Sequence, residues 1–254
     1  MTYSRQINEI VEERYQFCIW LNVIARERGV ENIINVDLFR DFLKTPQYTE
    51  LATLKGHNRI VGSRCLALHE NKLVSGSYDD TIRIWNTETH ATIATLNTPC
   101  HVSSVALDEN KLYASIHDKR SIHIWSTETY KHITTLDGHT YDVICIALHE
   151  NKLYSGSKDK TIRIWNTETY EPIATLEGHT EEMTCLTVHE NKLYSGSYDS
   201  TIRVWNTDTY EQVVSWKGHY SNYGNGPVPA YVLTLHDNKL YSAGADSMVR
   251  IWKI

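Results

Sequence analysis

The sequence lacks features that would assign the chain to a membrane, to nucleic acid or to an oxidising compartment. None of its apolar runs reaches the roughly 18 residues that a membrane-spanning helix needs. The formal net charge is −6 with the two signs interspersed, so nucleic-acid binding has no electrostatic support. Three of the five cysteines, Cys65, Cys145 and Cys185, recur at one position of an internal repeat. We expect buried strand residues there rather than disulfides, and therefore a reducing compartment.

Motifs that carry chemistry are also missing. The chain has no glycine-rich phosphate loop, no paired zinc-ligand motif and no nucleophile elbow. We therefore expect no enzymatic activity, no cofactor and no metal site. Glu9, Glu12, Glu13 and Arg14 stand where a signal peptide would be apolar, which predicts an intracellular protein, cytoplasmic or nuclear.

Tryptophans mark an internal repeat. Trp85, Trp125, Trp165 and Trp205 follow one another at intervals of 40 residues, and Trp252 comes 47 residues after Trp205. Self-similarity at this period predicts a repeat architecture. Within each copy, short alternating or β-branched apolar runs are bounded by turn residues, which predicts four short strands per copy.

The fullest copy spans residues 141–179. It contains the run Leu-Tyr-Ser-Gly-Ser-Lys-Asp-Lys-Thr-Ile-Arg-Ile-Trp and ends in Gly-His. These motifs resemble the WD-repeat β-propeller family, although Asn166 and Asn206 replace the family's aspartate after the tryptophan. Five copies share the pattern, and the resemblance covers residues 48–254. It implies an all-β propeller whose rims bind other molecules.

The two ends of the repeat region predict how the ring closes. Residues 48–57 match residues 170–179 almost position for position, so they correspond to the outer strand of a copy. The chain stops at Ile254, after the third strand of the last copy. Joining residues 51–54 to the strand around Trp252 completes one blade and removes two pairing edges. We expect a five-bladed WD-repeat β-propeller closed by its N-terminal strand, with pooling of blades between two chains as the alternative.

Residues 1–47 are expected to form an N-terminal α-helical extension, separate from the propeller at 48–254. Apolar residues at helical spacing run from Ser4 to about Arg28, and a second short helix is predicted over residues 37–44. Three interpretations of the apolar stripe remain open: packing on the propeller, dimerisation, or docking to another protein. Some WD-repeat proteins carry an F-box here, but its opening Leu-Pro is absent from this sequence.

The resemblance implies a buried polar quartet in four of the copies. The tryptophan N–H reaches a serine, the serine reaches a histidine, and the histidine reaches an aspartate. The quartets are Trp85, Ser75, His57 and Asp79; Trp165, Ser155, His139 and Asp159; Trp205, Ser195, His179 and Asp199; and Trp252, Ser242, His219 and Asp246. A serine bonded to a buried tryptophan offers no exposed nucleophile, so we expect a structural role and no catalytic residue.

The second copy departs from this pattern. Thr98-Pro99 replaces Gly-His, and Ala114 replaces the serine, which leaves Trp125 and Asp118. Losing both hydrogen-bonding partners together can leave stability nearly unchanged, whereas losing one leaves the other buried without a partner.

In this family the loop that carries Gly-His and the turn before the third strand open on one rim. The residues expected on that rim are Arg59, Tyr78, His117, Tyr141, Lys158, Glu182, Tyr198, Tyr220 and Tyr223. Tyrosines among single charges are typical of a protein-binding surface. The hairpin histidines His69, His149, His189 and His236 belong to the opposite rim, on separate blades and too far apart to share a zinc ion.

Together these patterns predict a non-catalytic scaffold that presents its rims to protein or peptide partners, as a monomer or as a dimer through the N-terminal helices. No nucleic-acid or membrane partner is expected. One alternative is a substrate-receptor subunit of a ubiquitin ligase that docks an adaptor through residues 1–47. An alternative of another class, a hydrolase or metal-dependent enzyme, has no motif to support it.

Overall fold

The structure, a computed structural model, describes residues 51–220 and 226–254. The predicted helices of residues 1–47, the boundary after residue 47, and Tyr223 lie outside the described residues. Leu54–Ile254 forms one compact unit. Within the described ranges all regular structure is β-strand, and no helix there could cross a bilayer.

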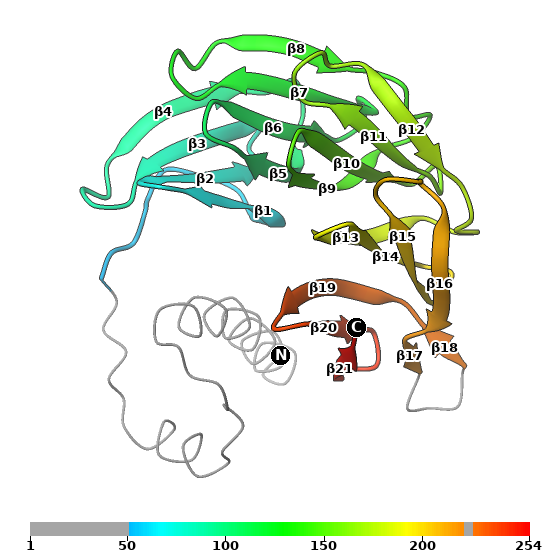
Figure 1. The fold of residues 1–254 in the computed structure, drawn as a ribbon. Coiled ribbons are helices and arrows are strands. Elements are labelled where there is room, and N and C mark those ends of the chain that lie inside the picture. The colour runs from blue at the N-terminus through cyan, green and yellow to red at the C-terminus, as the bar shows by residue number, and fades with distance from the viewer. Residues whose placement is uncertain (1–50, 221–225) are drawn as a thin grey trace, which may run out of the picture. The chain divides into compact units, whose positions relative to one another are not determined.

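The strands form antiparallel sheets, which we number 1 to 5 in chain order, and one short ribbon (Figure 1). Sheet 1 contains β1 (Val61–His69), β2 (Lys72–Ser77), β3 (Thr81–Asn86) and β4 (Thr92–Asn97). Sheet 2 contains β5 (Val102–Leu107), β6 (Lys111–Ile116), β7 (Ser121–Ser126) and β8 (His132–Leu136). Sheet 3 contains β9 (Val143–His149), β10 (Lys152–Ser157), β11 (Ile162–Asn166) and β12 (Pro172–Leu176).

Sheet 4 contains β13 (Met183–His189), β14 (Lys192–Ser197), β15 (Thr201–Asn206) and β16 (Gln212–Lys217). Sheet 5 contains β19 (Ala230–His236), β20 (Lys239–Gly244) and β21 (Val249–Lys253). The ribbon pairs β17 (His219–Tyr220) with β18 (Pro227–Val228) and lies between sheets 4 and 5 in the chain.

Successive sheets stack face against face, with their first strands side by side. β1 packs beside β5, β5 beside β9, β9 beside β13 and β13 beside β19, while the fourth strands lie on the outside (Figure 1). A sheet with neighbours on both faces must be apolar on both. Leu153 and Tyr154, which are consecutive in β10 and so point to opposite faces, are accordingly both fully buried.

The hydrophobic core is divided among the spaces between sheets. Between sheets 2 and 3, for example, Ile122 and Ile124 of β7 pack with Ile146 of β9 and with Trp165. Equivalent clusters lie between sheets 1 and 2, 3 and 4, and 4 and 5. Each fully buried aliphatic side chain contributes about 1.5–3 kcal/mol, so these interfaces hold the sheets together.

The closing strand expected at residues 51–54 is not formed. Within the described residues sheet 5 has three strands, and Leu51 is 89% exposed. Leu66 of β1 and Ile251 of β21 are each 50% exposed, whereas the equivalent Ile146 and Ile164 are buried. Five blades and closure remain predictions.

Candidate functional site

Buried polar quartets connect the rim loops to sheets 1, 3, 4 and 5. In sheet 3, the Trp165 Nε1–H donates to Ser155 Oγ at 2.9 Å. His139 places Nε2 2.8 Å from Ser155 Oγ and Nδ1 2.7 Å from Asp159 Oδ2. The other three quartets have the same three contacts, at 2.7–3.0 Å: Trp85, Ser75, His57 and Asp79; Trp205, Ser195, His179 and Asp199; Trp252, Ser242, His219 and Asp246.

Glycine precedes each quartet histidine, and Gly138 and Gly178 have φ angles of 157° and 152°, which other residues rarely adopt. A Cβ on Gly178 would lie 2.7 Å from Arg203 Nη1 and 3.1 Å from Trp205. Only glycine lets the backbone approach the tryptophan closely enough for His179 to enter the quartet.

In the quartet of sheet 4 the pKa shifts favour a neutral histidine beside an ionised aspartate. Burial lowers the pKa of His179, and the hydrogen bond to Asp199 only partly opposes this. Burial alone would raise the pKa of Asp199, but hydrogen bonds from His179 and Thr201 outweigh it and hold the pKa well below its usual range. Each member is therefore satisfied without net proton uptake at neutral pH.

This arrangement fixes loops and offers no nucleophile. Ser155 is fully buried, and its hydroxyl already accepts from Trp165 and bonds His139. Asp159 connects two rim loops. Its carboxylate accepts hydrogen bonds from Thr140 N at 3.0 Å and from Thr161 Oγ1 at 2.6 Å. The Gly-His loop and the turn before β11 are thereby held to each other.

Sheet 2 dismantles the quartet and repacks the space. Counted back from the first strand, Thr98 and not Pro99 takes the position of the histidine, since it precedes Val102 by the four residues that separate His139 from Val143. Thr98 donates its hydroxyl to the Cys100 carbonyl at 2.8 Å, and Ala114 is fully buried. His123 stacks on Trp125 with ring centroids 5.7 Å apart, and His132 meets the same indole edge-on at 5.6 Å. Asp118, whose side chain is 72% exposed, takes no part in this packing.

On the rim, side chains from three sheets form a continuous chain of contacts. The Tyr78 ring lies 4.7 Å from the His101 ring, which stacks on His117 at 4.0 Å. His117 Nδ1 is 3.6 Å from Asp142 Oδ2, and the same oxygen is 2.9 Å from Lys158 Nζ. Further round, Tyr198 meets Tyr231 edge-on at 6.0 Å. These two arcs are the recognition rim.

The expected rim residues fall into three groups. Tyr78, His117 and Lys158 are brought together by the chain of contacts just described. Tyr141, which is 59% exposed, lies under the Arg120 guanidinium at 5.6 Å. The others stand apart from the first arc: Arg59, Tyr198 and Tyr220 are exposed, Glu182 is half-buried, and Tyr223 lies outside the described residues.

Three rim residues were missed by the sequence analysis: His101, Asp142 and Tyr231. His101 and Asp142 occupy the third position after that of the quartet histidine, immediately before the first strand. Their carbonyls accept the backbone N–H of His117 and Lys158, each at 2.9 Å. An alignment of the copies at this position would have identified both contacts, His117 with His101 and Lys158 with Asp142.

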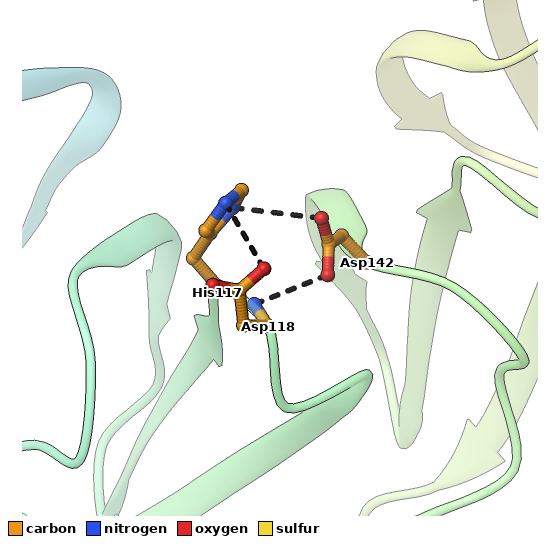
Figure 2. Close-up of side chains that lie close together, drawn as sticks. All are labelled: His117, Asp118 and Asp142. Atoms are coloured by element: carbon orange, nitrogen blue, oxygen red, sulfur yellow. Dashed lines mark hydrogen bonds and ion pairs between the residues drawn. The ribbon is translucent and has the colours of Figure 1, made fainter.

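Two carboxylates and an imidazole gather where sheets 2 and 3 meet (Figure 2). His117 Nε2 is 3.3 Å from Asp118 Oδ1, and the Asp118 N–H donates to Asp142 Oδ1 at 3.1 Å. Burial would raise the pKa of Asp142, but the hydrogen bond and charge of Lys158 outweigh it and lower the pKa. Asp142 is thus an ionised link between the two sheets.

On the opposite rim, lysines connect each sheet to the next. Lys72 Nζ donates to the Thr127 carbonyl at 3.2 Å, Lys111 Nζ to that of Thr167 at 2.6 Å, and Lys152 Nζ to that of Thr207 at 3.0 Å. We call these contacts the lysine ladder. It ties sheet 1 to 2, sheet 2 to 3 and sheet 3 to 4.

Comparison with known proteins agrees with this geometry. A family model for the WD domain, G-beta repeat (WD40), matches residues 48–86, 130–166 and 170–206. The chain contains WD40 repeats. Over 47 residues it is 53% identical to the probable E3 ubiquitin ligase complex SCF subunit scon-2 of Neurospora crassa, a stretch covering 18% of this chain and 7% of that protein.

Solved structures resemble this chain over most of its length. The match to the computationally designed Ika8 protein covers 74% of this chain and 57% of the Ika8 chain, at 28% identity and a TM-score of 0.66. U3-55K matches 79% of this chain and 63% of its own, at 22% identity and a TM-score of 0.70, which shows the fold alone. The chain thus spans less than two thirds of the length of each of these three proteins.

Proposed function

We propose that this WD-repeat protein is a non-catalytic interaction scaffold whose recognition rim holds a protein or peptide partner. The observation that carries the proposal is the chain of contacts from Tyr78 through His101, His117 and Asp142 to Lys158. It presents aromatic rings and charges from three sheets as one surface. Quartets beneath sheets 1 and 3 hold the adjoining loops, so little side-chain freedom is lost on binding.

Rim variants test this proposal. Partners captured by the full chain are identified, and their affinity is then measured for Tyr78→Ala combined with Tyr198→Ala. Truncating two exposed rim tyrosines should weaken binding about tenfold or more. Glu150→Ala, on an exposed hairpin of the opposite rim, is the matched control. The proposal fails if the control loses partners while the rim variant keeps them.

A second candidate is a substrate receptor of a ubiquitin ligase. It is favoured by the 53% identity over 47 residues to a protein described as an SCF subunit, although that stretch is 7% of that protein. In this case residues 1–47 would dock an adaptor. Deleting them should abolish capture of the adaptor and leave rim partners bound; adaptor binding that survives the deletion would contradict this candidate.

We also infer that sheets 5 and 1 close the ring into a five-bladed propeller. The positions that fill the other interfaces are apolar here as well: Val249 and Ile251 on sheet 5, and Leu66 and Trp85 on sheet 1. Together they would form a fifth core like that between sheets 2 and 3. One hydrogen bond, from Arg64 Nη2 to the Tyr231 carbonyl at 3.3 Å, already joins β1 to β19.

The lysine ladder and the chain length support the same closure. Lys239 of sheet 5 and Thr87 of sheet 1 occupy the repeat positions of the lysine and the threonine in the ladder, so Lys239 would donate to the Thr87 carbonyl. Leu54 precedes His57 by the same three residues that separate Leu176 of β12 from His179. A closing strand at residues 51–54 can therefore reach only a sheet directly beside sheet 1.

Hydrogen exchange tests closure without a mutation. In a closed ring the amides of residues 51–54 should exchange as slowly as those of residues 173–176, which pair with β11. Unprotected amides at residues 51–54 in a monomer would contradict closure. Protection that appears only in a dimer would support pooling of blades between two chains.

We place the protein inside the cell, in the cytoplasm or nucleus. Four described cysteines are free, and burial raises the pKa of Cys65 and Cys145 to about 12. Free thiols suit a reducing compartment. The helices expected in residues 1–47 would decide whether the protein is a monomer or a dimer, which light scattering of full-length and truncated chains would test.

A further inference from the structure

The cluster between sheets 2 and 3 combines the donor atoms that transition metals prefer. His117, Asp118 and Asp142 each offer one ligand atom, and these atoms lie within 4.8 Å of one another (Figure 2). Imidazole nitrogen together with carboxylate oxygen suits zinc and its neighbours. No metal site was expected from the sequence because the chain has no paired zinc-ligand motif. These three residues come from two different copies, and only the packing of the sheets brings them together.

The charges of the cluster leave room for a cation. Asp118 and Asp142 carry two negative charges, and Lys158, 2.9 Å from Asp142 Oδ2, supplies one positive charge. Apart from the imidazole, the group is therefore one positive charge short. A divalent ion would compensate both carboxylates and release Lys158, whose side chain is 31% exposed and whose flexible stem can place the ammonium in water.

The spacing and support of the donors are close to those of a metal site. Asp118 Oδ1 lies 3.3 Å from His117 Nε2 and Asp142 Oδ2 lies 3.6 Å from Nδ1, so the two carboxylates flank opposite ring nitrogens. One imidazole binds an ion through one nitrogen, and one ligand atom from each residue lies within 4.8 Å of the others, so a rotation of the exposed Asp118 side chain would bring the donors together. Two ligands bound at about 2.0–2.2 Å in a tetrahedral site would be roughly 3.3–3.6 Å apart. The His117 ring is also held by stacking on His101 at 4.0 Å, which limits its movement.

We propose that His117, Asp118 and Asp142 bind a divalent transition-metal ion such as zinc in competition with Lys158. Three protein ligands leave a coordination position on the recognition rim for water or for a donor from a partner. The histidines of the opposite rim differ, since each stands beside one carboxylate only: His149 with Glu150 at 4.0 Å, His189 with Glu190 at 3.9 Å, and His236 with Asp237 at 3.0 Å.

Calorimetric titration of the full chain with Zn²⁺ tests the site. We expect saturable binding of one ion, weakened about tenfold or more in His117→Ala and in Asp142→Asn. Lys158→Met should tighten binding several-fold because it removes the competing charge. His149→Ala is the matched control and should leave the affinity unchanged, and thermal melts without metal establish that every variant is folded.

Absorption spectra with Co²⁺ separate this site from the nearby thiol of Cys100. A nitrogen and oxygen site gives ligand-field bands without the thiolate charge-transfer band. The proposal is overturned by any of three results: no saturable phase, the same loss in His149→Ala as in His117→Ala, or a thiolate band that carries the binding. Failure would leave the scaffold proposal intact, because rim binding of a protein partner is measured separately and without metal.

Discussion

Sheets 2 and 3 each have four strands and the same strand register, but different side-chain contacts hold their rim loops in place. Sheet 3 uses the buried quartet of Trp165, Ser155, His139 and Asp159, whereas sheet 2 has Ala114 and Thr98 at two of those positions. The comparison shows that the fold tolerates loss of a quartet when the serine and histidine are lost together. The turn of sheet 2 is then tied by Asp118 N and His117 to Asp142 of its neighbour.

The largest loss of stability is expected when one member of the sheet 3 quartet is removed. His139→Ala leaves the buried Ser155 hydroxyl and the Asp159 carboxylate short of a partner, and it should lower the free energy of unfolding by about 3 kcal/mol. Urea denaturation measures the loss. The sheet-2-like double variant His139→Thr with Ser155→Ala should lose less than His139→Ala alone; an equal or larger loss would refute the idea that paired deletion is tolerated.

Acid should weaken sheet 4 through the quartet pair of His179 and Asp199. His179 and Asp199 both have a lower pKa folded than unfolded, so the unfolded chain binds more protons. The free energy of unfolding should therefore be highest above pH 6.5, decline as His179 of the unfolded chain titrates, and fall further below the ordinary Asp value of 3.8.

The aspartate step can be isolated by substitution. Asp199→Asn should remove its share of the loss below that value, on the order of 2 kcal/mol by pH 2. Urea midpoints across the pH range measure the slope. If wild type and Asp199→Asn have parallel profiles in acid, Asp199 is not held ionised by the quartet.

A hydroxyl returned to sheet 2 tests the same idea from the other side. Ala114→Ser places an oxygen in a fully buried position without the histidine that sheet 3 provides, and it should cost about 1–2 kcal/mol. Adding Thr98→His should recover part of that loss if the quartet can be rebuilt. Thermal melts of the single and double variants give the coupling energy between the introduced serine and histidine. A coupling energy of zero would mean that the loop of sheet 2 excludes the histidine.

The smallest effect is expected at the bridge between the two sheets. Asp142→Asn removes the partly exposed ion pair with Lys158 and should lower the free energy of unfolding by about 0.5–1 kcal/mol. Glu181→Gln is the control, since its 3.5 Å pair with Lys160 is more exposed and should contribute almost nothing. Equal effects of the two changes would show that Asp142 does not couple sheets 2 and 3.

The contacts within a copy were readable from the sequence, and those between copies mostly were not. Trp165 and Ser155 are 10 residues apart, and His139 and Ser155 are 16 residues apart, so one repeat brings them together. Three contacts join different sheets: the tilted ring contact of Tyr78 with His101, the bridge from His117 to Asp142, and the hydrogen bond from Lys111 to Thr167. Aligning the copies shows equivalent positions, but it does not show which side chains meet across an interface.

The amino-acid sequence alone determined the WD repeats, the strand pattern and the residues of the quartets, because strand pairing and quartet assembly depend on short separations and on a spacing that every copy repeats. The tertiary structure decided which rim side chains form the chain from Tyr78 to Lys158 and where His117, Asp118 and Asp142 converge. Closure of sheets 5 and 1 into a ring stays a prediction. The angle and distance between packed sheets set these features, and both depend on the sum of many side-chain volumes rather than on any local pattern.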